Sequence, residues 1–281
     1  MQYITNLTYK NRVDNEYRGF PLKVKLVYAW FSNIHYKYFF LKISPAVHSL
    51  MSDGVISEQV KKFVFTSRKT KEGVVQHEEN LEIYIPELLQ ASYNLYTWPS
   101  APILAWFLWE HKEELVGKRV LELGSGTALP GILASKCGAI VTLSDSANNP
   151  KSLRHIKKSC ELNGVFYQVK IIGITWGLFL STLFTIGPVD LIIGSDCFYD
   201  PSTFEDILVT VAYLLEKNPH SRFLCTYQER SADWSIEHLL NKWNLVCTHI
   251  PITDLGSQSN INIHELMRDH TIHLLNIEKA N

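Results

Sequence analysis

One short segment constrains the fold more than any other part of the chain. It is an apolar run over residues 119–123 that ends in Gly124-Ser125-Gly126. The run is short and strand-like in composition, so it predicts a central β-strand. Gly124 and Gly126 allow the backbone to turn sharply and to approach a ligand without a Cβ in between. The segment therefore predicts the strand–turn unit with which parallel α/β sheets bind adenosine-containing cofactors.

The residues that follow continue this unit. A helix is expected over residues 129–137, with Pro130 in its first turn and Gly138 at its exit. A strand over residues 139–144 comes next and ends at Asp145. A carboxylate about 20 residues after such a turn accepts hydrogen bonds from ribose hydroxyls.

Two residues distinguish between possible cofactors. A dinucleotide site needs a third glycine where this chain has Leu129. Glu122, at the end of the strand, disfavours a bound pyrophosphate and fits a cofactor with a cationic end. S-adenosylmethionine carries an ammonium and a sulfonium and no phosphate, so the pattern favours it. The alternatives are a nicotinamide-dependent oxidoreductase and a purely structural turn.

Composition excludes several classes of partner and site. The chain has 281 residues, 46% hydrophobic and 20% charged, which is typical of a globular protein. Its net charge of -1 provides no general attraction to nucleic acid or to an anionic membrane, so we expect neither as a partner. The five cysteines are scattered without a C-x-x-C motif, which indicates free thiols in a reduced intracellular protein. The 11 histidines form no metal-like spacing, so no metal site is expected.

The pattern along the chain divides it into two parts. Residues 1–62 form a basic, aromatic extension that we expect to be weakly ordered, although this composition also suits contact with nucleic acid. Residues 63–281 form one domain, and its strands alternate with helices as in a doubly wound parallel sheet. No long helix separates the last two strands, which predicts an antiparallel strand. The expected hairpin covers residues 63–66 and 81–85. Helices are expected at 100–115, 150–163, 203–217 and 232–243, and further strands at 168–172, 189–193, 221–227, 246–250 and 271–277.

Five motifs carry a family resemblance. They are Tyr96-x-Trp98-Pro99, Leu121-Glu122-Leu123-Gly124-Ser125-Gly126, Asp145, Thr175-Trp176-Gly177 and Gly194-Ser195-Asp196-Cys197-Phe198-Tyr199. With them the chain, over about residues 66–278, resembles the methyltransferase-like family of S-adenosylmethionine-dependent protein methyltransferases. The resemblance implies an α/β, doubly wound, seven-stranded Rossmann-like sheet with one inserted antiparallel strand. Residues 226–235 and 240–243 resemble a branch described as histone arginine methyltransferases of nucleus and cytoplasm, whereas other members mostly methylate lysine in non-histone proteins.

The resemblance also implies roles for single residues. Trp98 and the Gly124-Ser125-Gly126 backbone are expected to hold the methionine part of S-adenosyl-L-methionine, and Glu122 belongs to the same site. Asp145 is expected to bind the ribose, and Trp176 to cover the adenine with Ser195 beside it. Asp196 and Tyr199, the two ends of an acid-x-x-aromatic element, are the expected catalytic residues.

The acceptor residue stays open at this level. An arginine side chain remains protonated, so carboxylates must orient it, and Asp196 is the first candidate, with Glu229 and Glu205 as weaker ones. Tyr199 suits a lysine acceptor instead. We expect the partner to be a histone or another intracellular protein, met in the cytoplasm and the nucleus. A catalytically silent binding module is the lower alternative, against which the intact Gly124, Asp145, Asp196 and Tyr199 argue.

Overall fold

The structure is a computed structural model that describes residues 58–71, 74–88, 95–253, 255, 262–267 and 270–280. The extension predicted over residues 1–62 lies outside this part of the chain, except for residues 58–62, which belong to a strand. Within the described residues, no helix is both long enough and apolar enough to cross a membrane.

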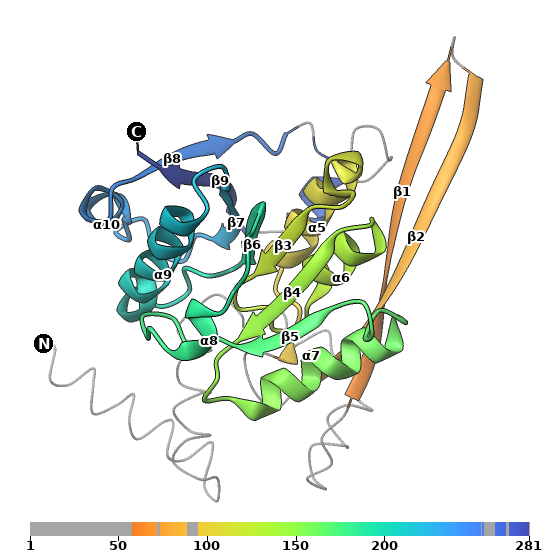
Figure 1. Ribbon diagram of the computed structural model, residues 1–281. Coiled ribbons are helices and arrows are strands. Elements are labelled where there is room, and N and C mark those ends of the chain that lie inside the picture. Colours follow the sequence, from red (N-terminus) through yellow and green to blue (C-terminus); the bar gives the residue numbers. More distant parts are fainter. Residues whose placement is uncertain are drawn as a thin grey trace, which may run out of the picture. The chain divides into compact units, whose positions relative to one another are not determined.

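A seven-stranded sheet forms the centre of the domain (Figure 1), in the order β5-β4-β3-β6-β7-β9-β8. Every strand pair in it is parallel except those of β9, which runs antiparallel to both β7 and β8. The predicted fold class, including the single inserted antiparallel strand, is therefore confirmed. The strand bounds are β3 (Arg119–Glu122), β4 (Ile140–Asp145), β5 (Lys170–Gly173), β6 (Leu191–Ser195), β7 (Phe223–Gln228), β8 (Leu245–Ile250) and β9 (Ile272–Lys279).

Helices cover both faces of this sheet, and the buried side chains form two clusters, one on each face. Successive strand residues point to opposite faces, so Val120 joins one cluster and Leu121 the other. The first face carries α5 (Ser100–Glu110), α6 (Leu129–Lys136) and α7 (Pro150–Leu162), and the second carries α9 (Phe204–Lys217) and α10 (Glu237–Lys242). The shorter helices are η2 (Lys112–Leu115), α8 (Ser181–Phe184), η3 (Pro201–Thr203) and α11 (Ile263–Met267).

A separate hairpin of β1 (Glu58–Lys71) and β2 (Val74–Leu88) packs against the first face. The Phe65 ring lies 4.9 Å from that of Trp106, between ring centroids. The Asn163 side chain accepts from the Tyr84 N–H at 2.9 Å and donates to the Tyr84 carbonyl at 2.6 Å, as a neighbouring strand would. The hairpin is much longer than the predicted apolar segments 63–66 and 81–85, because backbone pairing continues beyond them.

Two predicted helices are shorter in the structure. The helix expected over residues 100–115 ends at Glu110, and a separate 3₁₀ turn follows. The helix expected over residues 232–243 begins only at Glu237. Before it, the Ser231 and Ser235 hydroxyls accept the N–H groups of Asp233 and Glu237 at 3.3 and 3.2 Å. Such local side-chain bonds offer the backbone an alternative to the helix.

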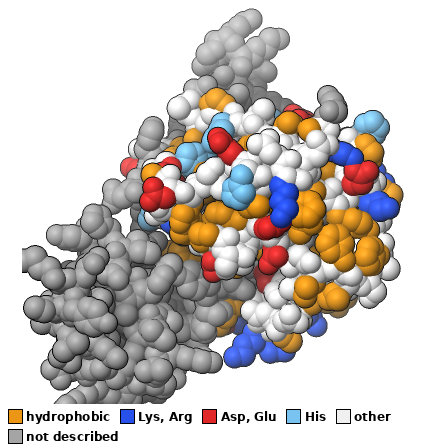
Figure 2. Space-filling view, turned by 90° about the vertical axis from the view of Figure 1, so that its left-hand side faces the viewer, with side chains coloured by type: hydrophobic (Ala, Val, Ile, Leu, Met, Phe, Trp, Pro, Cys, Tyr) orange, Lys and Arg blue, Asp and Glu red, His pale blue; other side chains and the backbone are white. Residues whose placement is uncertain are grey.

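Hydrophobic side chains gather on the side of the molecule that carries α8 and α9 (Figure 2). Four large exposed residues belong to the segment just after Trp176, namely Leu178, Phe179, Leu180 and Phe184. The rings of Phe179 and Phe184 lie edge-on against Tyr213 of α9, at 5.3 and 5.7 Å. The loop that carries Trp176 therefore continues directly into an apolar surface.

Candidate active site

The glycine turn after β3 has the backbone geometry that its sequence requires. Gly124 and Gly126 have φ of +64° and +54°, where a side chain is unfavourable. Ala128 also has a positive φ, +65°, although it carries a Cβ, which costs about 1–2 kcal/mol. The Ser125 N–H donates to the Ser144 carbonyl at 2.8 Å, so the turn is fastened to the end of β4.

Trp176 lies directly against Gly124. A Cβ at position 124 would stand 2.7 Å from Cζ2 of the indole, so only a glycine fits beneath the ring. The next residue, Gly177, fastens this loop to α9, because its N–H donates to Thr210 Oγ1 at 2.9 Å. The predicted adenine-covering residue and the glycine turn, 52 positions apart in the sequence, are therefore in contact in the fold.

Asp145 ends β4 beside the same turn. Its Oδ2 accepts the Gly126 N–H at 3.0 Å and its Oδ1 accepts the Ser146 N–H at 2.8 Å. Burial raises the pKa of this carboxyl, and the two N–H groups oppose the shift. Because a carboxylate has about four acceptor positions, Asp145 retains capacity for hydroxyl groups of a ligand.

Glu122 and Ser125 are both buried beside the turn. Glu122 is fully buried, and its carboxyl packs against Gly131 in the first turn of α6. Burial raises the pKa of Glu122 to about 8. The nearby Ser125 hydroxyl and Gly131 N–H oppose this shift, although neither makes a hydrogen bond with the carboxyl oxygens. The Ser125 hydroxyl accepts the Ser144 N–H at 3.1 Å. These side chains pack around the turn, and direct contact of Glu122 with a cofactor stays a prediction.

The loop after β6 brings the two expected catalytic residues to the same edge of the sheet. Asp196 has φ of +56°, an unusual conformation for an aspartate, and its N–H donates to the Thr226 carbonyl at 2.6 Å. The Cys197 thiol donates to the Leu123 carbonyl at 3.7 Å, beside Gly124. Tyr199 lies 6.4 Å from Trp176, between ring centroids. The loop thus runs from Asp196 to the wall of the Gly124 and Trp176 cluster.

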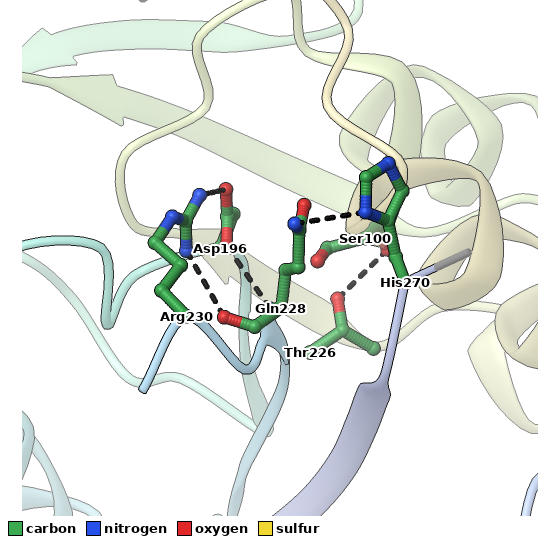
Figure 3. Close-up of polar contacts among 6 residues, drawn as sticks. All are labelled: Ser100, Asp196, Thr226, Gln228, Arg230 and His270. Atoms are coloured by element: carbon green, nitrogen blue, oxygen red, sulfur yellow. Dashed lines mark hydrogen bonds and ion pairs between the residues drawn. The ribbon is translucent and has the colours of Figure 1, made fainter. Parts of the chain in front are cut away.

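The Asp196 carboxylate is already bound to a guanidinium. Arg230, just after β7, donates from Nη1 to Oδ1 at 3.0 Å and from Nη2 to Oδ2 at 2.6 Å (Figure 3). Oδ1 also accepts the Gln228 N–H at 3.2 Å. Both paired side chains are more than nine-tenths buried. This two-point pair is the strongest geometry available to an arginine and a carboxylate.

Trp98 and Ser195 border these residues. The Arg230 guanidinium carbon lies 5.7 Å from the Trp98 ring centroid, within the range of a cation–π contact. Tyr96 packs edge-on against Trp98 at 5.5 Å. Ser195 is half-buried at the last position of β6, immediately before Asp196. Trp98 therefore lies near the Asp196–Arg230 pair, and Gly124, Gly126, Asp145 and Trp176 form a second group linked to it by the Tyr199 loop.

Arg230 is the functional candidate that sequence reasoning missed. The sequence marks it only as part of a family motif, without a role. The available signal was its position, two residues beyond the strand predicted to end near residue 227, because the carboxyl ends of parallel strands meet at one edge. An arginine at that edge would be expected to meet the aspartate that follows the neighbouring strand.

Comparison with known proteins identifies the family that this chain resembles. Residues 77–240 match a family model described as lysine methyltransferase. The chain is 45% identical over 221 residues to a Xenopus laevis protein named Histone-arginine methyltransferase METTL23, covering 78% of this chain and 91% of that protein. A Homo sapiens protein of the same name is 44% identical over 187 residues, which is 66% of this chain and 98% of that protein. A Danio rerio protein named Protein N-lysine methyltransferase METTL21A is 30% identical over 175 residues, covering 61% and 76%.

Proposed function

This chain belongs to the lysine methyltransferase family, and we propose that it transfers methyl groups to arginine side chains of a histone. It is a protein methyltransferase that uses S-adenosylmethionine. The observation that carries the arginine proposal is the 44–45% identity to two relatives named for that activity, over more than nine-tenths of each relative. A histone substrate places the activity in the nucleus, and a cytoplasmic location stays a prediction.

We assign the cofactor to the edge where β3 and β4 end. Asp145 retains acceptor positions for ribose hydroxyls, and the Trp176 ring offers a flat apolar surface to a purine. An aromatic ring over a base contributes about 1–3 kcal/mol. Gly126, at a positive φ beside Asp145, permits close approach of a ligand to the backbone. When bound, S-adenosylmethionine supplies a methyl group attached to a cationic sulfur.

We assign the acceptor to the neighbouring loop, from Asp196 to Tyr199. The task of the protein there is to align the acceptor nitrogen and to exclude water. Burial raises the pKa of the Tyr199 phenol, so the hydroxyl stays protonated and can donate or accept a hydrogen bond. Tyr199 is also 39% exposed, which leaves one side open to a protein substrate.

An arginine acceptor needs a carboxylate, and the three acids that the sequence suggests all have partners. Asp196 pairs with Arg230, Glu229 contacts His273 Nε2 at 2.8 Å, and Glu205 pairs with Lys242 at 2.5 Å. Glu229 and Glu205 are 36% and 43% exposed, so exchanging a partner there costs little. We therefore favour Glu229, at the end of β7, as the acid that a substrate guanidinium would meet.

A lysine acceptor is the second candidate, and the buried pair favours it. Asp196 uses both oxygens on Arg230, so its charge is neutralised within the protein. A lysine amine must lose its proton before it attacks, and a site without a free negative charge promotes that loss. The family description and the Danio rerio relative also carry the word lysine in their names.

Labelling with the purified full-length chain distinguishes the two acceptors. The chain is incubated with isotopically labelled S-adenosylmethionine and either core histones or a histone-depleted extract, and mass spectrometry locates the label. The proposal expects label on histone arginine. Label only on lysine contradicts it and supports the second candidate. Cofactor binding without any labelled protein indicates a silent binding module.

A further inference from the structure

The buried pair of Asp196 and Arg230 holds together three segments of the site. Asp196 follows β6 and Arg230 follows β7 (Figure 3). Trp98 precedes α5. The guanidinium donates to Asp196 through two nitrogens, lies over Trp98, and donates from Nη1 to the Gln228 carbonyl at 3.1 Å. The side chains of Arg230 and Asp196 are only 8% and 6% exposed, so this contact is made away from solvent.

Asp196 turns the chain at the end of β6, because its φ of +56° lies in the left-handed region. Aspartate adopts this region more often than most residues with a side chain, and here several contacts fix it. Arg230 and the Gln228 N–H hold the carboxylate, and the Thr226 carbonyl accepts the Asp196 N–H. The direction in which the chain leaves Asp196 is therefore set by contacts that centre on Arg230.

That direction decides where Tyr199 lies. Only Cys197 and Phe198 separate the two residues, and both are buried. The Cys197 thiol bonds the Leu123 carbonyl, and the Phe198 ring packs edge-on on Phe204 at 5.4 Å. With two buried residues between them, Tyr199 has little freedom relative to Asp196, so we expect a displacement of Asp196 to shift Tyr199 beside the Trp176 ring.

We propose that Arg230 is a positioning residue of the acceptor site. It holds the Asp196 carboxylate and, through the loop 196–199, sets the place of Tyr199 next to Trp176. The inference rests on the proposed methyl transfer at this edge of the sheet and adds a residue to it. Arg230 acts through Asp196 and Tyr199, whereas the cofactor residues Gly126 and Asp145 are fastened to each other by a separate bond.

The test compares Arg230→Ala and Arg230→Lys with the unchanged full-length chain, with histones as the acceptor. A misplacement of about 1 Å at a reacting group lowers turnover by about 100-fold, so we expect a loss of that size in kcat for Arg230→Ala. Cofactor affinity, measured by calorimetry, is expected to stay close to that of the unchanged chain. Arg230→Lys keeps the charge but loses the planar two-point contact, so it is also expected to be impaired.

Chemical rescue separates positioning from a merely structural role. Millimolar guanidinium is expected to raise kcat of Arg230→Ala by about tenfold, because it restores the two-point pair, whereas ammonium at the same concentration is not. A matched control is Arg119, which makes the same type of pair with Asp190 at the opposite end of β6. Arg119→Ala is expected to keep its turnover and to show no response to guanidinium.

Hydrogen exchange provides a readout that does not require activity. In Arg230→Ala the amides of residues 196–199 are expected to exchange faster, and guanidinium is expected to restore their protection. The inference is overturned if Arg230→Ala and Arg230→Lys both keep their amide protection and their kcat. It is also overturned if kcat and cofactor affinity fall together and guanidinium does not restore kcat. If the unchanged chain labels no protein, the proposed function fails, and the exchange measurement still decides the positioning role.

Discussion

Strand β6 has an aspartate immediately before it and another immediately after it, and each makes a two-point ion pair with an arginine. Asp190 at the amino end accepts from Arg119 Nε at 2.8 Å and Nη2 at 2.6 Å. Asp196 at the carboxyl end accepts from Arg230 at 3.0 and 2.6 Å. Both pairs have two contacts, through Nε and Nη2 in Arg119 and through Nη1 and Nη2 in Arg230. Asp190 and Arg119 are 28% and 45% exposed, whereas Asp196 and Arg230 are only 6% and 8% exposed.

The main differences between the pairs are their burial and the backbone conformation of the aspartate. Arg119 begins β3 and Asp190 precedes β6, so the exposed pair fastens two adjacent parallel strands in a solvent-screened setting. The buried pair fixes an aspartate with a positive φ at the carboxyl edge, where parallel sheets bind their ligands. An aspartate–arginine pair therefore joins two strands at the amino edge of the sheet, whereas at the carboxyl edge it forms part of the candidate site.

The largest effect is expected from Asp196→Ala. It leaves the buried Arg230 without its carboxylate, which costs about 3–5 kcal/mol of unfolding free energy, and it removes turnover. Urea denaturation followed by tryptophan fluorescence measures the first effect. Adding Arg230→Leu is expected to recover most of the stability but none of the activity, since the unpaired charge is then gone. A loss below about 1 kcal/mol for Asp196→Ala would show that the pair is not buried in solution.

Asp145→Ala tests the other half of the carboxyl edge. Hydrogen bonds to a charged carboxylate contribute about 1.5–3 kcal/mol each, so losing those to a ribose is expected to weaken cofactor affinity by about 100-fold or more. Calorimetry with S-adenosylmethionine measures this loss. Asp190→Ala, at the amino edge, is the matched control and is expected to bind normally. Equal affinities in the two variants would refute the assigned role of Asp145.

Much of the fold was predictable because it rests on local patterns. The alternation that sends Val120 to one face and Leu121 to the other is visible in the sequence, as is the glycine turn that ends β3. The convergence of Gly124, Asp145 and Trp176 was also predictable, because each follows a predicted strand and parallel strands end at one edge. The structure places Gly126 and Asp145 in direct contact, as that argument expects.

The remainder depends on distances in space that no local pattern encodes. Arg230 and Asp196 are 34 positions apart, and nothing in their flanking residues specifies the pair. Aspartate tolerates a positive φ, but no local pattern specifies one at Asp196. Glu122 is predicted to suit a cationic cofactor, and that contact stays a prediction; its packing against Gly131 of α6 is not visible in the sequence.

Glu122→Gln tests a buried acid that, unlike Asp196, has no charged partner among the described residues. The folded-state pKa of Glu122, about 8, lies above its ordinary value of 4.5. Its contribution to the free energy of unfolding is therefore full below about pH 4.5 and falls as the pH rises to about 8. The slope is at most about 1.4 kcal/mol per pH unit. Urea midpoints between pH 5 and 8 are expected to fall more steeply in the unchanged chain than in Glu122→Gln. Parallel curves would contradict this protonation.

The smallest effect is expected from Asp190→Asn, which breaks the exposed pair. Arg119 holds the pKa of Asp190 well below its ordinary value, so the stability from this pair is present at neutral pH and is lost as the pH falls through the acid range. Because both side chains are substantially exposed, salt screens the attraction. The variant is expected to keep its turnover and to lose a little stability at pH 7 in low salt, with the difference from the unchanged chain vanishing in about 1 M salt, where the Debye length is near 3 Å. A loss that persists in salt, or a fall in turnover, would mean that the amino edge is coupled to the site. The two ends of β6 would then no longer be independent.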